Sequence, residues 1–261
     1  MMQPLSRKKR LGYLALCFVL FLIIAPVAIL YAKGYRLTET FQITRTGGLY
    51  ISVGYSGAQI YINGSLSKET GVFQKGALIQ NLKPGSYKIR VEKNDLNPWE
   101  KELPVFKETV TEARVLMLPL ESEMVEILDS SDVAGLFGNK TYASSTGPKI
   151  INKLMAQKEN GEVTVRWQGE SDSQPSYFCQ EEKCQDEISI KTSENINTFF
   201  FLPGRDDLII FQSNNGIYVA EIDNRSQQNI QPVLEHPDLA LRVSDNTILI
   251  KEKGKFYSVA L

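Results

Sequence analysis

The hydrophobic positions of this chain follow two patterns, one near the N-terminus and another through the rest of the sequence. Residues 11–32 form an unbroken apolar run without a charged side chain. Because an α-helix rises about 1.5 Å per residue, a run of this length matches the ~30 Å hydrocarbon core of a bilayer. From residue 47 onward, apolar and polar positions alternate with the period of a β-strand. The pattern therefore predicts one membrane-spanning helix followed by an all-β body.

The charges around the apolar run indicate its orientation. The run directly follows four basic residues, Arg7, Lys8, Lys9 and Arg10. No acidic residue precedes Glu39. Since basic residues that flank a membrane helix stay on the cytoplasmic side, we expect a cytoplasmic tail over residues 1–10. The helix over 11–32 then makes this a single-pass protein of the cell membrane, with its C-terminal domains extracytoplasmic.

Two other kinds of N-terminal segment share some of these features. A cleaved secretory signal has an apolar core of about 7–15 residues and a small-x-small cleavage site, whereas this run is longer and places Leu30 where a small residue is needed. A lipoprotein signal would modify Cys17, but Leu16 stands at the preceding small position and the apolar run continues past it. We therefore favour an uncleaved anchor.

The alternating region after a short stalk at 33–46 predicts a small β-sandwich over residues 47–120. Asn63-Gly64 follows an apolar-polar alternation and is a strong hairpin signal, because both residues tolerate a positive φ. Pro84-Gly85 is a second turn signal of the type II class. Several short strands without a convincing helix bury their apolar faces most simply as two facing sheets.

The same stretch resembles a PEGA domain, a small β-sandwich module of prokaryotic envelope proteins. The resemblance rests on 57–64 (GAQIYING), Thr70, 82–91 (LKPGSYKIRV) and Pro98-Trp99. The tetrapeptide that names the family keeps only its Gly57-Ala58 half, and the interval 65–76 reads as a loop longer than usual. The resemblance implies a surface or wall-associated binding module that is not a catalyst.

The remainder, residues 121–261, is also predicted to be rich in strands. The segment 199–223 resembles one blade of a bacterial β-propeller, and 240–261 repeats its rhythm roughly 40 residues later, a blade-like spacing. The length suits roughly three blades, while a closed ring needs at least four. Three interpretations stay open: an incomplete propeller, a β-meander covered by something else, and a ring completed by another chain.

Composition and cysteine spacing limit the chemistry of the predicted exterior. Apart from the four basic residues before the helix, the chain carries 25 basic and 30 acidic residues, which argues against non-specific nucleic-acid binding. Cys179 and Cys184 are close in sequence, and such pairs outside the cytoplasm usually form a disulfide. A zinc site needs about four ligands, and His236, the sole histidine, is remote. We expect this disulfide, no metal and no cofactor.

No pattern in the sequence predicts a catalytic residue. A Ser-His-Asp triad would have to use His236, and the chain has no G-x-S-x-G nucleophile motif. Acidic pairs such as Glu181-Glu182 and Asp206-Asp207 are typical of turns, and a glycosidase would need two carboxylates that face one cleft. Calcium-loop, phosphate-loop and dinucleotide motifs are missing from the sequence.

Aromatic side chains are the candidate ligand contacts, because rings can stack on sugars. Tyr55, Tyr61 and Trp99 are the residues to examine, although a ring such as Trp99 also suits the core of a small sandwich. We predict a membrane-anchored protein that binds or scaffolds a wall glycan, a surface glycan or an envelope protein without catalysis. An accessory subunit that completes a propeller is the alternative, and an envelope hydrolase is the least favoured interpretation.

Overall fold

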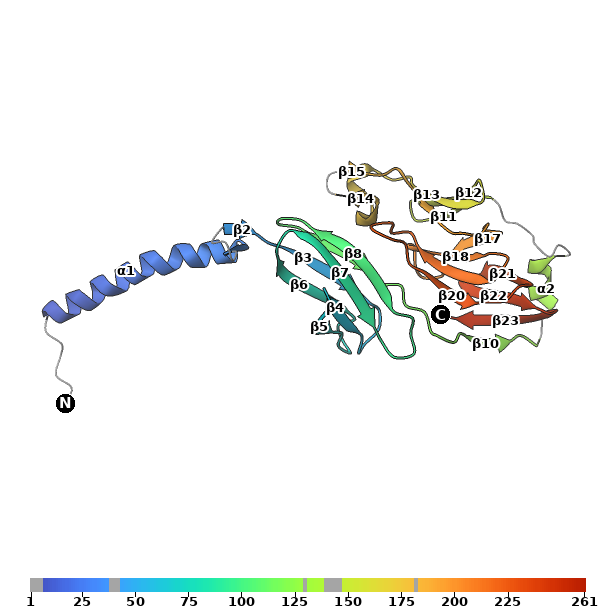
Figure 1. Ribbon diagram of the computed structural model, residues 1–261, viewed down its shortest axis with the longest axis horizontal. Coiled ribbons are helices and arrows are strands. Elements are labelled where there is room, and N and C mark those ends of the chain that lie inside the picture. The colour runs from blue at the N-terminus through green and yellow to red at the C-terminus, as the bar shows by residue number, and fades with distance from the viewer. Residues whose placement is uncertain (1–6, 38–42, 129–130, 139–146, 181–182) are drawn as a thin grey trace.

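The computed structural model describes residues 7–37, 43–128, 131–138, 147–180 and 183–261. Figure 1 shows an N-terminal helix, a β-sandwich and a larger C-terminal β-region in that order along the molecule. The sequence prediction of an all-β body on one N-terminal helix is confirmed.

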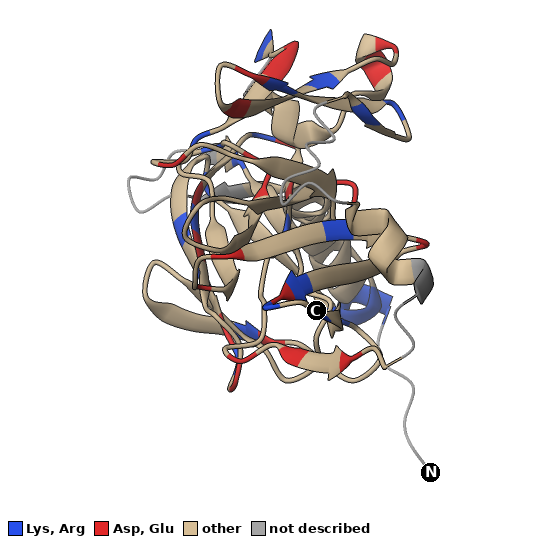
Figure 2. Cartoon of the chain, turned by 90° about the vertical axis from the view of Figure 1, so that its right-hand side faces the viewer, with Lys and Arg blue, Asp and Glu red and all other residues tan. Residues whose placement is uncertain are grey.

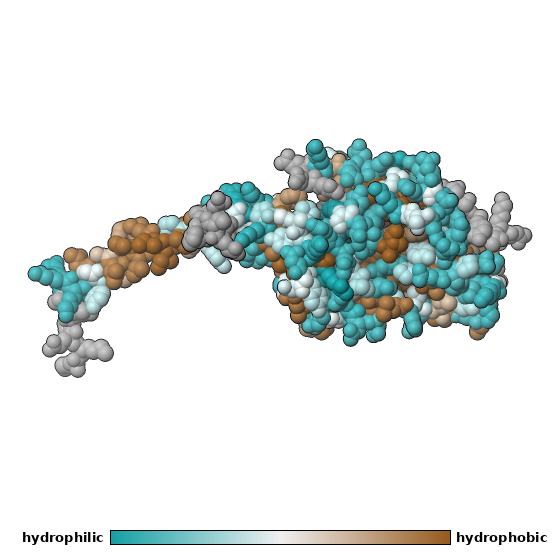
Figure 3. Space-filling model, in the orientation of Figure 1, coloured by the Kyte–Doolittle hydropathy of each residue, from teal (hydrophilic) through white to brown (hydrophobic). Residues whose placement is uncertain are grey.

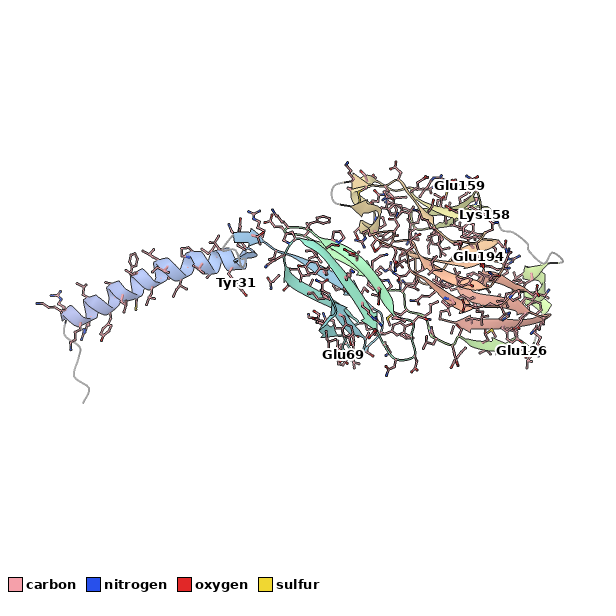
Figure 4. The ribbon with its side chains drawn as sticks, viewed as in Figure 1. Tyr31, Glu69, Glu126, Lys158, Glu159 and Glu194 are labelled. Atoms are coloured by element: carbon pink, nitrogen blue, oxygen red, sulfur yellow. A yellow bond between two sulfur atoms is a disulfide. The ribbon has the colours of Figure 1, made fainter. Side chains whose placement is uncertain are left out.

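The N-terminal helix is α1 (Arg7–Ala32), with Pro26 inside it and no buried residue. Its mean hydropathy is 2.9 in the most apolar window, and it is long enough to cross a membrane. Figure 3 shows it as a hydrophobic band that stands clear of the more polar body. Tyr31, labelled in Figure 4, lies at its C-terminal end, where aromatic residues suit a membrane interface.

A short hairpin joins the helix to the sandwich. Strand β1 (Tyr35–Leu37) pairs with β2 (Ile43–Arg45). The backbone N–H and the Oγ1 of Thr46 both donate to the carbonyl oxygen of Gly34, at 3.1 and 3.0 Å. The end of the hairpin is thereby tied to the end of α1, so that the sandwich begins directly beside the predicted membrane surface.

The sandwich consists of two facing sheets. The three-stranded sheet has the order β6 (Gly76–Leu82), β3 (Gly47–Ser52) and β9 (Val110–Arg114), with β3 and β9 parallel. The four-stranded sheet has the order β5 (Ser65–Glu69), β4 (Gln59–Ile62), β7 (Gly85–Glu92) and β8 (Trp99–Val105). The buried side chains between them include Leu49, Ile51, Ile60, Ile89 and Leu103.

One predicted loop is instead a strand. Asn63 and Gly64 have φ values of 49° and 81°, and they turn the chain from β4 directly into β5, within the interval expected to be a loop. All five residues of β5 are exposed, because it is an edge strand that presents neither face to the core. A strand of this kind carries no apolar alternation, so the sequence pattern could not reveal it.

The C-terminal region contains three four-stranded antiparallel sheets. The first is formed by β11 (Lys149–Ile151), β12 (Leu154–Glu159), β13 (Glu162–Trp167) and β16 (Glu187–Ile190). The second is formed by β17 (Thr198–Phe201), β18 (Leu208–Gln212), β19 (Ile217–Glu221) and β20 (Ile230–Leu234). The third is formed by β10 (Glu123–Glu126), β23 (Lys255–Ala260), β22 (Thr247–Glu252) and β21 (Leu239–Ser244).

The third sheet joins the two ends of the region. Strand β10, at the beginning of the C-terminal region, pairs with β23 at the end of the region, with Glu123 opposite Ala260.

The remaining described elements are α2 (Ser131–Phe137), the single-turn helices η1 (Ser171–Ser173) and η2 (Ser176–Phe178), and the two-residue strands β14 (Cys179–Gln180) and β15 (Lys183–Cys184).

The three sheets stack on one another, with the second in the middle. Phe199 and Ile209 of the second sheet pack with the first sheet, while its opposite face contributes Leu208 and Ile210 to the core shared with the third sheet and the sandwich. The outer face of the third sheet is covered by α2, where the rings of Phe137 and Phe256 lie 5.3 Å apart.

The outer face of the first sheet is polar. Arg166 of this face bonds to Glu159 at 2.7 Å and to Glu187 at 2.9 Å. Glu159 is labelled in Figure 4 on the side of the region away from the sandwich core. The stack therefore ends in a helix-covered face and a charged face.

Candidate binding groove

A groove of about 670 Å³ crosses the outer face of the four-stranded sheet of the sandwich. Side chains alternate along a strand, so Ile89 and Val91 of β7 point into the core while Lys88 and Arg90 point outward. The register places Tyr61 of β4, Arg90 of β7 and Glu100 of β8 in one row across the sheet. The groove is lined by Tyr61, Gly64, Lys88, Ile89, Arg90, Glu92, Glu100, Lys101, Glu102, Ser226 and Gln227.

The groove carries charges of both signs. Its lining includes the outward-pointing Lys88 and Arg90 and three acidic residues, Glu92, Glu100 and Glu102, whereas the Lys101 side chain is buried in the joint with Glu221. The guanidinium of Arg90 bonds to Glu92 and, at 3.0 Å, to Glu100. These pairs are exposed and add little stability, but they leave the groove with only one unbalanced negative charge. Figure 2 shows the same mixing of basic and acidic residues over the C-terminal end of the molecule.

The structure brings one of the three candidate aromatic residues to the groove. The half-buried Tyr61 lies in its wall, and its hydroxyl donates to Oε1 of Gln59 at 2.8 Å. Tyr55 lies elsewhere: it packs on the edge of the core, and its hydroxyl donates to the carbonyl oxygen of Met117 at 3.3 Å.

Trp99 does not reach the surface. Its exposed fraction is 0%, and its indole Nε1 donates to Oε2 of Glu221 at 3.0 Å. A ring that is enclosed on all sides cannot stack on a sugar, so Trp99 has the core position that its size also suits. It belongs to the joint between the sandwich and the second C-terminal sheet, which determines one wall of the groove.

A buried ion pair forms the centre of this joint. The side chains of Lys101 and Glu221 are 0% and 2% exposed and bond to each other. Burial raises the pKa of the Glu221 carboxyl, while the Lys101 ammonium and the Trp99 indole act in the opposite direction. The ammonium also donates to the carbonyl oxygens of Asp223 at 2.7 Å and Gln227 at 3.1 Å. The pair is thus fully hydrogen-bonded, as a buried pair must be to persist.

Further buried hydrogen bonds connect the two units. The side chain of Gln231, 5% exposed, accepts from the N–H of Leu118 at 2.7 Å and donates to the carbonyl oxygen of Leu116 at 2.9 Å. Arg225 donates to the carbonyl oxygen of Glu112 at 2.6 Å. These bonds hold β20 and the loop before it against the sandwich. No sequence pattern predicted these bonds, because the partners are ordinary polar residues far apart along the chain.

A second, smaller crevice of about 180 Å³ lies between β9 and η2. One acidic pair of the sequence is found here and has cationic partners: Arg114 bonds to Asp206 at 2.6 Å, and Arg205 bonds to Asp207 at 2.7 Å. Burial alone would raise the pKa of Asp206, but Arg114 and the Asn152 amide hold it below its ordinary value. This arrangement is that of a structural joint. The other acidic pair, residues 181–182, lies outside the described residues.

The disulfide follows η2, the short helix that contributes to this crevice. Cys179 and Cys184 are bonded to each other, as predicted from their spacing, and they pair β14 with β15. The preceding residue Phe178 is fully buried in the core between the first and second sheets. Burial raises the pKa of the neighbouring Tyr177 hydroxyl, and the nearby Asp207 carboxylate acts in the same direction.

The sole histidine is not part of the groove lining. His236 is half-exposed, with its Nδ1 3.1 Å from the carbonyl oxygen of Pro237 and its Nε2 3.8 Å from Glu252. Over the part of the chain that the structure describes, no group of three or more His, Cys, Asp or Glu side chains is placed to hold a metal ion.

Comparison with known proteins identifies no family for this chain. No protein-family model matches it, and no curated protein matches it in sequence. Among solved structures, the chain is similar to a protein described as AfRom2 CNH domain, with 16% identity. The match covers 74% of this chain and 69% of that one, at a TM-score of 0.27, which does not establish a shared fold.

Proposed function

We propose that this protein is a single-pass, membrane-anchored component of a cell envelope whose β-body binds an envelope polymer without catalysis. The apolar helix α1 follows basic residues, which favours a cytoplasmic N-terminus. The disulfide between Cys179 and Cys184 suits an oxidising compartment, which favours an extracytoplasmic position for the rest. Together these two features support a body held outside the cytoplasm by one helix.

The groove on the sandwich is the observation that carries the binding role. It has the size of common ligand sites, it combines a tyrosine ring with polar side chains, and it lies on a sheet face rather than on a mobile terminus. The non-catalytic part of the proposal is supported by the acidic side chains Glu221, Asp206 and Asp207, because each is engaged by a cation in a joint between structural units.

The alternative role, an accessory subunit that completes a propeller, has less support. An added blade would need an apolar face at one end of the stack of sheets. The third sheet is covered there by α2, and the first presents the Arg166 ion pairs.

Co-purification of the full-length chain from source-cell membranes tests the binding role. A C-terminally tagged protein is crosslinked in cells and purified in detergent, and retained sugar and protein are measured by compositional analysis and mass spectrometry. We expect the wild type to retain an envelope polymer and the double variant Tyr61→Ala/Lys88→Ala to lose most of it.

The matched control is Tyr50→Ala/Lys75→Ala, which changes the same residue types on the other sheet and in an exposed loop. This control is expected to retain the polymer. Equal retention by the groove variant, or no envelope polymer on the wild type, would refute the proposal.

A further inference from the structure

The groove is built by both β-units and not by the sandwich alone. Ser226 and Gln227 belong to the loop between β19 and β20 of the C-terminal region, yet they line part of the groove. The backbone N–H of Glu102 lies 3.4 Å from Oγ of Ser226, and the Lys101 ammonium bonds to the carbonyl oxygen of Gln227 at 3.1 Å. One wall of the groove therefore depends on the joint between the units.

This loop has a conformation that serine seldom adopts. Ser226 has a φ of 61°, and its Oγ accepts from the N–H of Gln227 at 2.6 Å. The preceding residue Arg225 is buried and bonds to Asp223 and to the backbone of β9, which maintains the turn. A non-glycine residue in the left-handed region that the surroundings hold in place is a recurrent feature of ligand sites.

Some groups in the groove have no partner among the residues that the structure describes. Arg90 bonds to Glu92 and Glu100, and Glu102 accepts from Ser86 at 2.6 Å. Among the described residues, the Lys88 ammonium and the Gln227 side-chain amide have no hydrogen-bond or ion-pair partner. They offer three donors and a donor–acceptor pair beside the Tyr61 ring.

We infer that the groove binds a segment of an uncharged polysaccharide, held by Tyr61 and Lys88 of the sandwich on one side and by Gln227 of the C-terminal region on the other. This inference rests on the proposed function and names its ligand class. Hydroxyl groups need both donors and acceptors, and a tyrosine ring offers an apolar face for a sugar ring. Two basic and three acidic side chains face the groove, and the single unbalanced charge attracts neither a polyanion nor a polycation strongly over distance.

A peptide ligand fits this surface less well. Extended peptides bind open sheet edges, and helical or proline-rich peptides bind apolar or aromatic grooves. This groove lies on the face of the sheet, over β4, β7 and the edge strand β8, which pair with one another, and more than half of its lining residues are charged.

Titration calorimetry on the full chain in nanodiscs of zwitterionic lipid tests the inference. The probes are uncharged hexamers of N-acetylglucosamine, glucose and mannose, together with a poly(glycerol phosphate) of similar length and an extended peptide. We expect at least one uncharged hexamer to bind with an affinity that is the same at low and high salt. Tyr61→Ala and Gln227→Ala are each expected to weaken that binding about tenfold, a typical effect of removing one ring or polar contact.

The controls are Tyr50→Ala and Gln74→Ala, which change an exposed tyrosine on β3 and an exposed glutamine in the loop before β6. Both are expected to leave binding unchanged. Tighter, salt-sensitive binding of the anionic polymer, or preferred binding of the peptide, through Tyr61 would overturn the ligand class while the proposed function stands. An unaffected Gln227→Ala variant would overturn the shared groove. If no probe binds, the inference fails, and the co-purification result then decides whether the proposed function fails with it.

Discussion

At the residue scale, a single buried carboxylate connects the two β-units. Glu221 accepts hydrogen bonds from Trp99 and Lys101 of the sandwich and from Asn229 of its own region. Such a pair costs desolvation energy when it forms, so its main effect is to specify one docking geometry. Its integrity nevertheless matters, since the loss of one partner leaves an uncompensated charge in the core.

The substitution Lys101→Met is expected to lower the free energy of unfolding by about 3–5 kcal/mol, because Glu221 would remain buried without its cation. Denaturant titration of the full chain in detergent, followed by tryptophan fluorescence, measures the change. The double variant Lys101→Met/Glu221→Gln also removes the unpaired carboxylate, and it is expected to recover part of the lost free energy of unfolding.

The exposed pair Arg45–Glu108 provides the matched comparison. Both side chains are about half exposed and screened by solvent, so Arg45→Met is expected to lower the free energy of unfolding far less than Lys101→Met does. Equal effects of Lys101→Met and Arg45→Met would contradict the role assigned to the buried pair.

Residue identity alone predicted local conformations better than it predicted contacts. The turn at Asn63-Gly64 was foreseeable, because the positive φ depends on those two residues. The burial of Trp99 against Glu221 was not, since 122 residues separate the partners and the choice between core and surface is made by the second unit.

At the scale of elements, amphipathic alternation revealed the strands that border a core. The length and uniform hydropathy of residues 11–32 revealed α1. Alternation missed β5, whose side chains are all exposed, and it could not assign the strands of 121–261 to sheets. The pairing of β10 with β23 joins the two ends of that region, and no local pattern encodes such a partner.

The disulfide is a covalent link between two short strands, and its contribution to stability can be tested directly. Replacing Cys179 and Cys184 by serine removes a short closed loop and is expected to lower the free energy of unfolding by about 2 kcal/mol. Denaturant titration measures this loss, and trypsin cleavage after Lys183 in the stapled loop is expected to become faster. The control Cys17→Ser lies in α1 and is expected to change neither quantity. Free thiols at both positions in protein freshly isolated from cells would contradict a stabilising disulfide.

At the scale of the whole molecule, specific contacts connect the helix to the sandwich and the sandwich to the C-terminal sheets. Thr46 ties the sandwich to the end of α1, and the Lys101–Glu221 pair ties it to the second sheet. A groove that spans the second joint would be carried at a defined distance from the membrane. This arrangement suits a protein that holds a ligand near the surface to which it is anchored.

The proposed topology predicts that protease added to intact spheroplasts digests the β-body and leaves a short membrane-embedded fragment that contains α1. Immunoblotting against a C-terminal tag and an N-terminal tag measures the outcome. A cytoplasmic marker must stay intact until the cells are permeabilised. A C-terminal tag that survives protease in intact spheroplasts would place the body inside and remove the basis for an envelope ligand.

The sequence by itself determined the N-terminal apolar helix, the strand-rich character of the body, the tight turns and the disulfide pair, because each depends on hydropathy or on residues close together in the chain. Only the tertiary structure decided which aromatic residue reaches the surface, how the strands of 121–261 divide into three stacked sheets, and that a loop of the C-terminal region completes the groove. These outcomes depend on contacts between segments that are not neighbours in the sequence, such as β10 with β23 and Trp99 with Glu221, and such contacts leave no periodic trace in a single sequence.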